Sequence, residues 1–151
     1  MKLPAVKLSA ALILAGLAAA PAVAEMGQLP PEKTQGAVSY IAGGIGQDES
    51  DAIKRAAGRY ALELEFSQTA RPRNVYLADV KVAIRSASSG KTMLDTVSDG
   101  PYLVANLPPG KYNVTVEQNG ATQQRSVDVK AGQHQRLAFV WPGTATDRAT
   151  D

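Results

Sequence analysis

Apolar and polar residues alternate along most of the chain between Tyr60 and Trp141. At residues 60–66 the even positions are apolar, whereas Glu63 and Glu65 stand between them. Successive side chains of a strand point to opposite faces, so this spacing predicts strands with one buried and one polar face. Seven strands are predicted, at residues 60–66, 76–85, 92–97, 102–107, 112–117, 125–129 and 136–141.

Turn signals separate these strands, and the clearest is Asn119-Gly120, a pair typical of two-residue hairpins. Short strands joined by such turns predict a two-sheet antiparallel sandwich. The strand parity predicts that most aromatic side chains point into its core, namely Phe66, Tyr76, Tyr112, Phe139 and Trp141. Tyr40 and Tyr102 remain as aromatic residues free to face solvent.

A short helix is predicted before the first of these strands. Apolar residues recur there at helical spacing, at Ala52, Ile53, Ala56, Ala57 and Tyr60. We expect about three turns, with Asp48 as the N-cap. The preceding residues 43–46 (GGIG) could suggest a phosphate-binding loop, but they lack the Lys and Ser/Thr of a P-loop. The acidic residues that follow would also repel a phosphate, so we interpret this segment as a tight structural turn.

The first 24 residues have the pattern of a secretory signal peptide. Lys2 and Lys7 precede an apolar run at residues 8–20, and Ala22 and Ala24 form a small-x-small cleavage site. The run of 13 residues is too short to span a bilayer, so we expect cleavage after Ala24 and no stable membrane insertion afterwards. The predicted location is therefore the bacterial periplasm or the exterior.

The expected organisation is a signal peptide at residues 1–24, a flexible linker at 25–39, one domain at 40–142 and a disordered tail at 143–151. The linker is predicted from its Pro, Gly and polar residues. Loss of 24 residues leaves a chain of 127 with 14 basic and 14 acidic residues, so its formal charge is zero. That balance gives no support to nucleic-acid binding.

Composition also limits the chemistry that this protein can perform. The sequence contains no cysteine, and its one histidine is His134. This excludes disulfides, thiolate zinc sites, iron–sulfur clusters, cysteine nucleophiles and a histidine-rich metal centre. No catalytic residue, metal ligand or cofactor is therefore predicted. His134 is expected to be a solvated surface residue, and the basic loop 71–74 a solubilising one.

Residues 100–116 (GPYLVANLPPGKYNVTV) resemble the carboxypeptidase regulatory-like domain family, whose hallmark is Leu-Pro-x-Gly-x-Tyr-x-Val-x-Val. The resemblance implies a seven-stranded, transthyretin-like (prealbumin-like) sandwich over roughly residues 40–142. Residues 43–49 and the helix resemble a subset of small exported bacterial proteins with this domain. Two prolines stiffen the corner of the motif, and Tyr112 then enters the next strand on the inward parity.

The activities of related proteins do not transfer to this chain. A zinc peptidase needs several metal ligands, which one histidine cannot supply. Transthyretin-like hydroxyisourate hydrolases depend on several histidines and a Tyr-Arg-Gly-Ser-type end, whereas this chain ends in Thr-Asp-Arg-Ala-Thr-Asp. An isopeptide bond through Lys81 is disfavoured, because Lys81 has outward parity and the last strand offers no Asn.

The sequence thus predicts a non-enzymatic exported sandwich that acts as an interaction or accessory module for another envelope or secreted protein. Its strand edges are the expected means of pairing. The alternative is a carbohydrate or small-ligand binding module that presents loops at Asn74, Tyr102 and Asn119. A third hypothesis is an enzyme with an unrecognised carboxylate site. No ligand-binding residue is assigned from the sequence.

Overall fold

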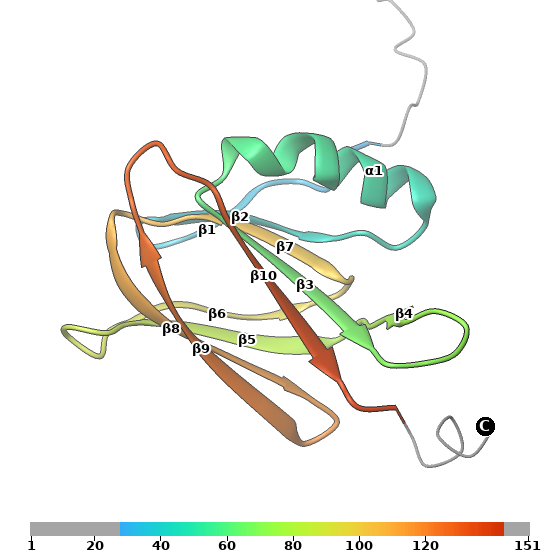
Figure 1. Ribbon diagram of the computed structural model, residues 1–151. Helices are drawn as coiled ribbons and strands as arrows, with labels where there is room; N and C mark the ends of the chain where they lie inside the picture. Colours follow the sequence, from blue (N-terminus) through green and yellow to red (C-terminus); the bar gives the residue numbers. More distant parts are fainter. Residues whose placement is uncertain (1–27, 144–151) are drawn as a thin grey trace, which may run out of the picture.

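A computed structural model describes residues 28–143, so the predicted signal peptide with Ala22 and Ala24 and nearly all of the predicted tail lie outside the described residues. The described part contains ten strands and one α-helix (Figure 1). In chain order they are β1 Lys33–Gln35, β2 Val38–Gly43, α1 Gln47–Ala56 with a 3-10 turn Ala57–Arg59, β3 Leu62–Gln68, β4 Val75–Tyr76, β5 Val80–Ser86, β6 Thr92–Ser98, β7 Tyr102–Asn106, β8 Gly110–Gln118, β9 Ala121–Val129 and β10 Gln135–Trp141. No helix in this part of the chain has the length and apolar character needed to cross a membrane.

The strands form two sheets, which pack as the predicted mainly-β sandwich. The first sheet has the order β1-β2-β7-β3-β10, with β4 beside the end of β3. The second sheet has the order β6-β5-β8-β9. Helix α1 covers the outer face of the first sheet, on the side away from the second (Figure 1). The strands β2 and β7 of the first sheet are therefore covered on both faces.

Each of the seven predicted strands has a counterpart, but the count of seven is wrong. β1 and β2 were not predicted, and β4 was predicted only as the start of the strand 76–85. β1 lies within the segment 25–39 that was expected to be a linker, and β2 begins in it. β2 lacks the alternation of a strand with one polar face, since Tyr40 contacts the main core and Ile41 packs under α1. Burial on both faces removes the polar positions on which the prediction depends.

The predicted strand 76–85 is in fact two strands in different sheets. β4 pairs with β3 in the first sheet, whereas β5 pairs with β6 and β8 in the second. Asp79 lies between them with a φ of 57°, a conformation that interrupts an extended strand. The parity of β5 therefore does not extend to Tyr76, whose side chain is 54% exposed instead of buried.

The prediction that all neighbouring strands are antiparallel is wrong at one pair. β10 runs parallel to β3, with Phe139 opposite Phe66 and Trp141 opposite Gln68. Parallel neighbours need a long connection, and here the strands from β4 to β9 supply it.

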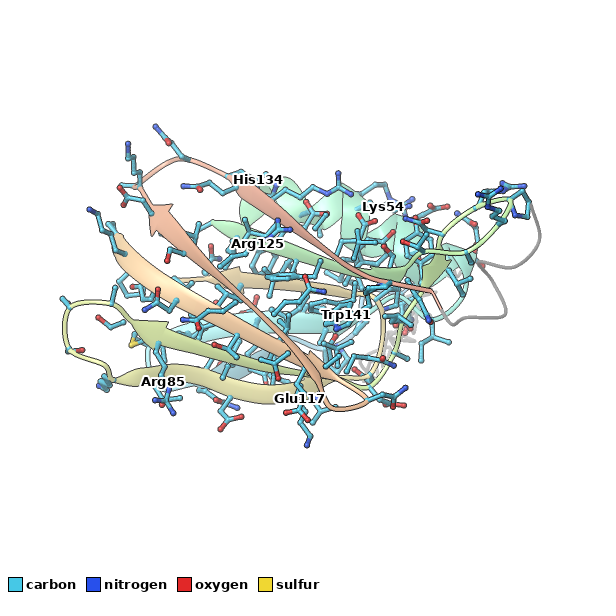
Figure 2. All side chains as sticks on the ribbon, turned by 60° about the horizontal axis from the view of Figure 1, so that its bottom comes forward. Lys54, Arg85, Glu117, Arg125, His134 and Trp141 are labelled. Atoms are coloured by element: carbon cyan, nitrogen blue, oxygen red, sulfur yellow. The ribbon has the colours of Figure 1, made fainter. Side chains whose placement is uncertain are left out.

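The main core lies between the two sheets. Phe66, Phe139 and Trp141 form an aromatic cluster with ring centroids 6.1–6.4 Å apart, as their parity predicts. Figure 2 shows Trp141 between the sheets, whereas Arg85 and Glu117 lie on the outer face of the second sheet.

A second, smaller apolar cluster lies between α1 and the first sheet. Its buried members are Ile41, Ile53, Ala57, Tyr60, Tyr102 and Val104. The expectation that Tyr40 and Tyr102 face solvent is therefore wrong: Tyr40 belongs to the main core and Tyr102 to this second cluster. The helix makes the outer face of the first sheet an interior surface, which strand parity alone cannot reveal.

The corner between β7 and β8 has the structure predicted from the Leu-Pro-Pro-Gly-Lys-Tyr string. Tyr112 is buried, and its hydroxyl donates a hydrogen bond to the carbonyl oxygen of Pro108 at 2.5 Å. Burial raises the pKa of this phenol. A tyrosine that bonds back to the backbone just upstream fixes the direction in which the next strand leaves the corner.

Side chains bridge the two sheets along both of their open sides. On one side the Gln35 amide donates to the carbonyl oxygen of Asp95 at 2.9 Å and accepts from its N–H at 3.0 Å. On the other side Trp141 Nε1 donates to the carbonyl oxygen of Ala121 at 3.0 Å, and Gln123 Nε2 donates to that of Val140 at 3.0 Å. The strand edges are therefore less available for pairing than the sequence predicts.

The backbone approach of Gly100 to Gly43 gives a test of this packing. A Cβ at position 100 would lie 2.1 Å from the carbonyl oxygen of Gly43. We expect Gly100→Ala to lower the free energy of unfolding by about 1–3 kcal/mol in urea denaturation, as overpacking does. Gly58→Ala is the matched control, since its Cβ meets nothing within 4 Å, and it should change stability by no more than about 0.5 kcal/mol. Equal effects would contradict the close approach.

Candidate binding surface on the first sheet

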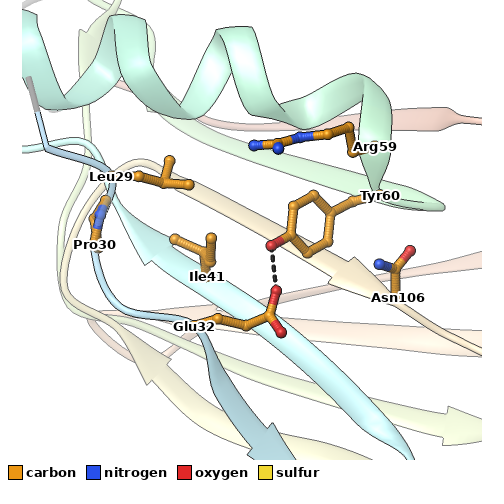
Figure 3. A pocket seen from close by; sticks show the side chains of 7 residues that line it. All are labelled: Leu29, Pro30, Glu32, Ile41, Arg59, Tyr60 and Asn106. Carbon is orange, nitrogen blue, oxygen red and sulfur yellow. Dashed lines mark hydrogen bonds between the residues drawn. The ribbon is translucent and has the colours of Figure 1, made fainter.

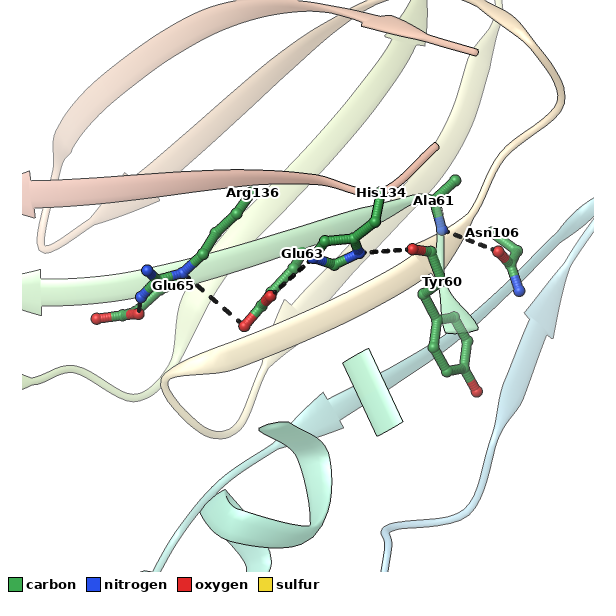
Figure 4. A network of polar contacts seen from close by, with 7 residues as sticks. All are labelled: Tyr60, Ala61, Glu63, Glu65, Asn106, His134 and Arg136. Carbon is green, nitrogen blue, oxygen red and sulfur yellow. Dashed lines mark hydrogen bonds and ion pairs between the residues drawn. The ribbon is translucent and has the colours of Figure 1, made fainter. Parts of the chain in front are cut away.

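A cluster of charged residues lies on the outer face of the first sheet, beside the part that α1 covers (Figure 4). It consists of Glu63, Glu65, His134 and Arg136. The parallel pairing places Arg136 directly opposite Glu63. The two glutamates have the outward parity that the sequence predicts, but Glu63 is only 7% exposed.

The contacts of Glu63 connect β3 to the segment before β10. Its Oε2 lies 3.1 Å from Nε2 of His134, and its Oε1 lies 3.9 Å from Nε of Arg136. Arg136 also bonds to the carboxylate of Glu65, and this interaction raises the pKa of the Arg136 guanidinium. Arg136 thus pairs with both glutamates, and His134 contacts one of them.

Both ring nitrogens of His134 face acceptors. Nδ1 lies 2.8 Å from the carbonyl oxygen of Tyr60, and Nε2 faces the Glu63 carboxylate. A carbonyl can only accept, so Nδ1 donates; a ring protonated at both nitrogens donates to both neighbours. His134 lies at the surface, as predicted, yet these two contacts hold its ring in place.

The contacts of this cluster are made among its own residues and with the backbone of Tyr60. Among residues 28–143 there is no group of three or more His, Cys, Asp and Glu residues that could hold a metal ion. The cluster contains no hydroxyl or thiol nucleophile, and its carboxylates are paired with cations. What it does is attach β10 and the preceding loop to β3.

A pocket of about 430 Å³ lies next to this cluster, since Tyr60 lines the pocket and its carbonyl oxygen contacts His134 (Figure 3). Its lining residues are Leu29, Pro30, Glu32, Ile41, Arg59, Tyr60 and Asn106. The Tyr60 hydroxyl donates to Oε2 of Glu32 at 2.5 Å. Burial, and then the hydrogen bond to Glu32, raise the pKa of Tyr60 to about 12. The side chain of Asn106 accepts from the N–H of Ala61 at 3.0 Å.

A third feature, which we call the end groove, lies where the start of α1 meets β4. It has a volume of about 430 Å³ and is lined by Gly44, Ile45, Gly46, Gln47, Ser50, Lys54, Tyr76, Leu77, Ala78 and Pro101. Ile45 is 65% exposed and Tyr76 is 54% exposed, although both are large and apolar. Exposed apolar side chains that share one groove are typical of binding surfaces.

The loop beside the end groove connects β2 to α1, and Gly43 of the predicted turn is the last residue of β2. The N–H of Gly44 donates to Oε1 of Glu49 at 2.8 Å, and the Ser50 hydroxyl donates to the Gly44 carbonyl oxygen at 2.6 Å. The carboxylate of Glu49 thus occupies the amide that a phosphate would need. The predicted N-cap is wrong: α1 begins at Gln47, and Gly46 rather than Asp48 is the N-cap.

The three residues suggested for a ligand-binding loop surface do not form one. Asn74 is exposed before β4, and Asn119 is exposed in the hairpin between β8 and β9. Tyr102 is 1% exposed, so its ring is not available to a ligand from solvent. Lys81 points outward, as predicted, and lies 3.8 Å from Glu117.

The sequence analysis did not identify the end groove. Tyr76 was assigned to the core because its parity matched that of β5, and Ile45 was interpreted only as part of a turn. The sequence signal for the groove was Ile45, because this isoleucine lies between two glycines and has no apolar residue beside it in the chain.

Comparison with known proteins agrees with the two-sheet fold. The model of the carboxypeptidase regulatory-like domain family matches residues 68–142, from the end of β3 to just after β10. This part of the chain therefore belongs to that family, whose members are non-catalytic β-sandwich domains. None of the curated proteins matches the chain.

The buried carboxylate of Glu63 can be tested by removing its charge. We expect Glu63→Gln to lower the free energy of unfolding by about 1–3 kcal/mol, because His134 and Arg136 lose their shared anion. Glu117→Gln makes the same change in the exposed pair with Lys81 and should cost less than about 1 kcal/mol. Urea denaturation of both variants measures the difference. Equal costs would show that Glu63 does not anchor the cluster.

Tyr60 gives a prediction at alkaline pH. Its folded pKa of about 12 lies above the ordinary value of 10, so the stability that it contributes is complete below pH 10 and is lost as pH rises towards 12. Tyr60→Phe removes this contribution, so its free energy of unfolding should fall less than that of the wild type between pH 8 and 11.5. An equally steep fall in Tyr60→Phe would contradict the assignment.

Proposed function

We propose that this protein is a non-enzymatic, exported β-sandwich that acts as an interaction or accessory module for another protein of the bacterial envelope. Export is proposed from the signal-like segment 1–24. The absence of catalytic activity is proposed from the non-catalytic character of the family and from the mutual pairing of charges around Glu63.

The observation that carries the proposal is the end groove. Three of the large exposed apolar residues, Ile45, Val75 and Tyr76, belong to its loop and to β4. Ile45 and Tyr76 line the groove itself. Placing apolar side chains in water has no benefit for folding, and a partner that covers them would recover that free energy.

The groove replaces the strand edges as the expected means of binding. Gln35, Gln123 and Trp141 already bond to backbone groups along the open sides of the sandwich. A partner strand would have to displace these bonds before it could pair there.

A cross-linking experiment in native envelope tests the proposal. The tagged protein, purified after export, is lightly cross-linked and its partners are identified by mass spectrometry. We expect one stoichiometric protein partner, whose capture falls at least about fivefold with Tyr76→Ser. Val97→Ser is the matched control, since Val97 is also about half exposed (53%) but lies in β6, outside the groove.

If no protein is captured from the envelope, the result contradicts a protein partner. It would favour the second candidate function, binding of a carbohydrate, which the exposed ring of Tyr76 supports because sugars stack on such rings. Thermal-shift measurements with a glycan panel test that candidate. A shift that Tyr76→Ser abolishes would establish it, and the lack of any shift would exclude it.

A further inference from the structure

We infer that the end groove binds an extended segment of a partner protein in which an apolar side chain lies next to an aspartate or glutamate. This inference rests on the proposed function and names the chemistry of the partner. Its evidence is the rigid presentation of Ile45 and Tyr76 and the charge of Lys54.

Ile45 is exposed on a loop that is held in place. Gly44 and Gly46, on either side of it, have φ values of 100° and 86°, which residues with a Cβ rarely adopt. A Cβ at position 44 would also lie 2.6 Å from Cδ2 of Tyr102. The bonds of Glu49 and Ser50 to Gly44 fix the loop further. A partner that packs on Ile45 therefore has little conformational entropy to remove.

Tyr76 also lines the groove, and both its backbone and its ring have partners. Its backbone pairs with Ser67 of β3, and its ring centroid lies 5.6 Å from that of the buried Tyr102. Leu77 and Pro101, both buried, also line the groove. The result is a preformed apolar slot of about 430 Å³, a volume within the usual range of about 300–1,000 Å³ for binding pockets.

The charge at the groove is positive. Lys54 is its one charged lining residue, and Nζ of Lys54 lies 5.4 Å from the centroid of the Tyr102 ring. Figure 2 shows Lys54 at the surface. Across residues 28–143 no carboxylate forms an ion pair with it.

Two of the acidic residues at the start of α1 have other hydrogen-bond partners, and none of the acidic residues described there forms an ion pair with Lys54. The carboxylate of Glu49 accepts from Gly44, and that of Asp51 accepts from Gln47 at 2.9 Å. Asp48 lines a different pocket. A carboxylate on the partner would therefore complement a cation that the described residues leave without an anion.

Other occupants fit these contacts less well. A second copy of the chain, related by a two-fold axis through this groove, would bring two Lys54 side chains towards each other. A sugar would need several convergent polar groups, yet the Ser50 hydroxyl and the Gln47 amide are already donors within the loop and helix. An apolar side chain would fill the groove, and a neighbouring carboxylate would pair with the ammonium group of Lys54.

The groove lies at the boundary of the family match. Tyr76, Leu77 and Pro101 belong to the matched residues 68–142, whereas the loop and α1 precede them. The groove therefore combines residues of the matched sandwich with residues of the segment that precedes the match.

A display selection with a random-peptide library tests the inference. The targets are the protein purified after export, Lys54→Glu, and Arg55→Glu as the matched control, because Arg55 is the next exposed residue of α1 and does not line the groove. The wild type and Arg55→Glu should enrich peptides with an aromatic or aliphatic residue next to Asp or Glu. Lys54→Glu should enrich Lys or Arg at that position instead.

The affinity of one fluorescently labelled, selected peptide then locates the site. Ile45→Ser and Tyr76→Ser should each weaken its binding at least about tenfold, whereas Val97→Ser should leave it unchanged. Thermal melting confirms that each variant folds. If Lys54→Glu does not fold, Lys54→Gln replaces it and should lose the acidic preference without reversing it.

Three outcomes would overturn the inference: no enriched peptide, no acidic preference, or a preference that Lys54→Glu leaves unaltered. None of them decides the proposed function, which the cross-linking experiment tests separately. A partner protein captured from envelope equally well by Tyr76→Ser would preserve the function and reject this groove.

Discussion

The parallel pairing of β10 with β3 is the interaction on which the rest of the structure depends. It brings the last strand back beside the strand that follows α1, and so places Phe139 opposite Phe66 on the inner face. On the outer face the same register places Arg136 opposite Glu63. It also aligns β10 with the open side of the second sheet, where Trp141 and Gln123 form their bridging bonds. One strand pairing thus determines the aromatic core, the charged cluster and the closure of one side.

The sequence predicted the elements that have one polar face and failed where both faces are covered. The seven strands with alternating residues were found, as was the corner at Tyr112, because each local pattern is sufficient to specify its element. β2 could not be predicted, since Tyr40 and Ile41 are buried on opposite faces and leave no polar positions to alternate. The contacts of His134 with Tyr60 and Glu63 join residues more than 70 positions apart in the chain, and no local pattern contains them.

The candidate site depends on the same kind of long-range information. Asp79 adopts a left-handed conformation between β4 and β5, and this separates Tyr76 from the parity of the strand that follows. The ring then lies against Tyr102 at the edge of the groove. Helix α1 has a related effect, because it covers Tyr102, which parity leaves facing solvent, and brings Lys54 over its ring. An exposed apolar surface is thus created where the family's sandwich meets the segment that precedes it.

The side-chain amide of Gln35 has a consequence for the protein in concentrated solution. By occupying both backbone groups of Asp95, it removes a donor and an acceptor that another molecule could use to extend the sheet. On the opposite side, Gln123 and Trp141 each occupy one backbone carbonyl oxygen, those of Val140 and Ala121. Self-association into open-ended stacks of sheets is thereby discouraged, even though the chain exposes isoleucine, valine and tyrosine at one end. Some backbone groups along both sides are thus already bonded, whereas the large apolar residues at the end groove are exposed.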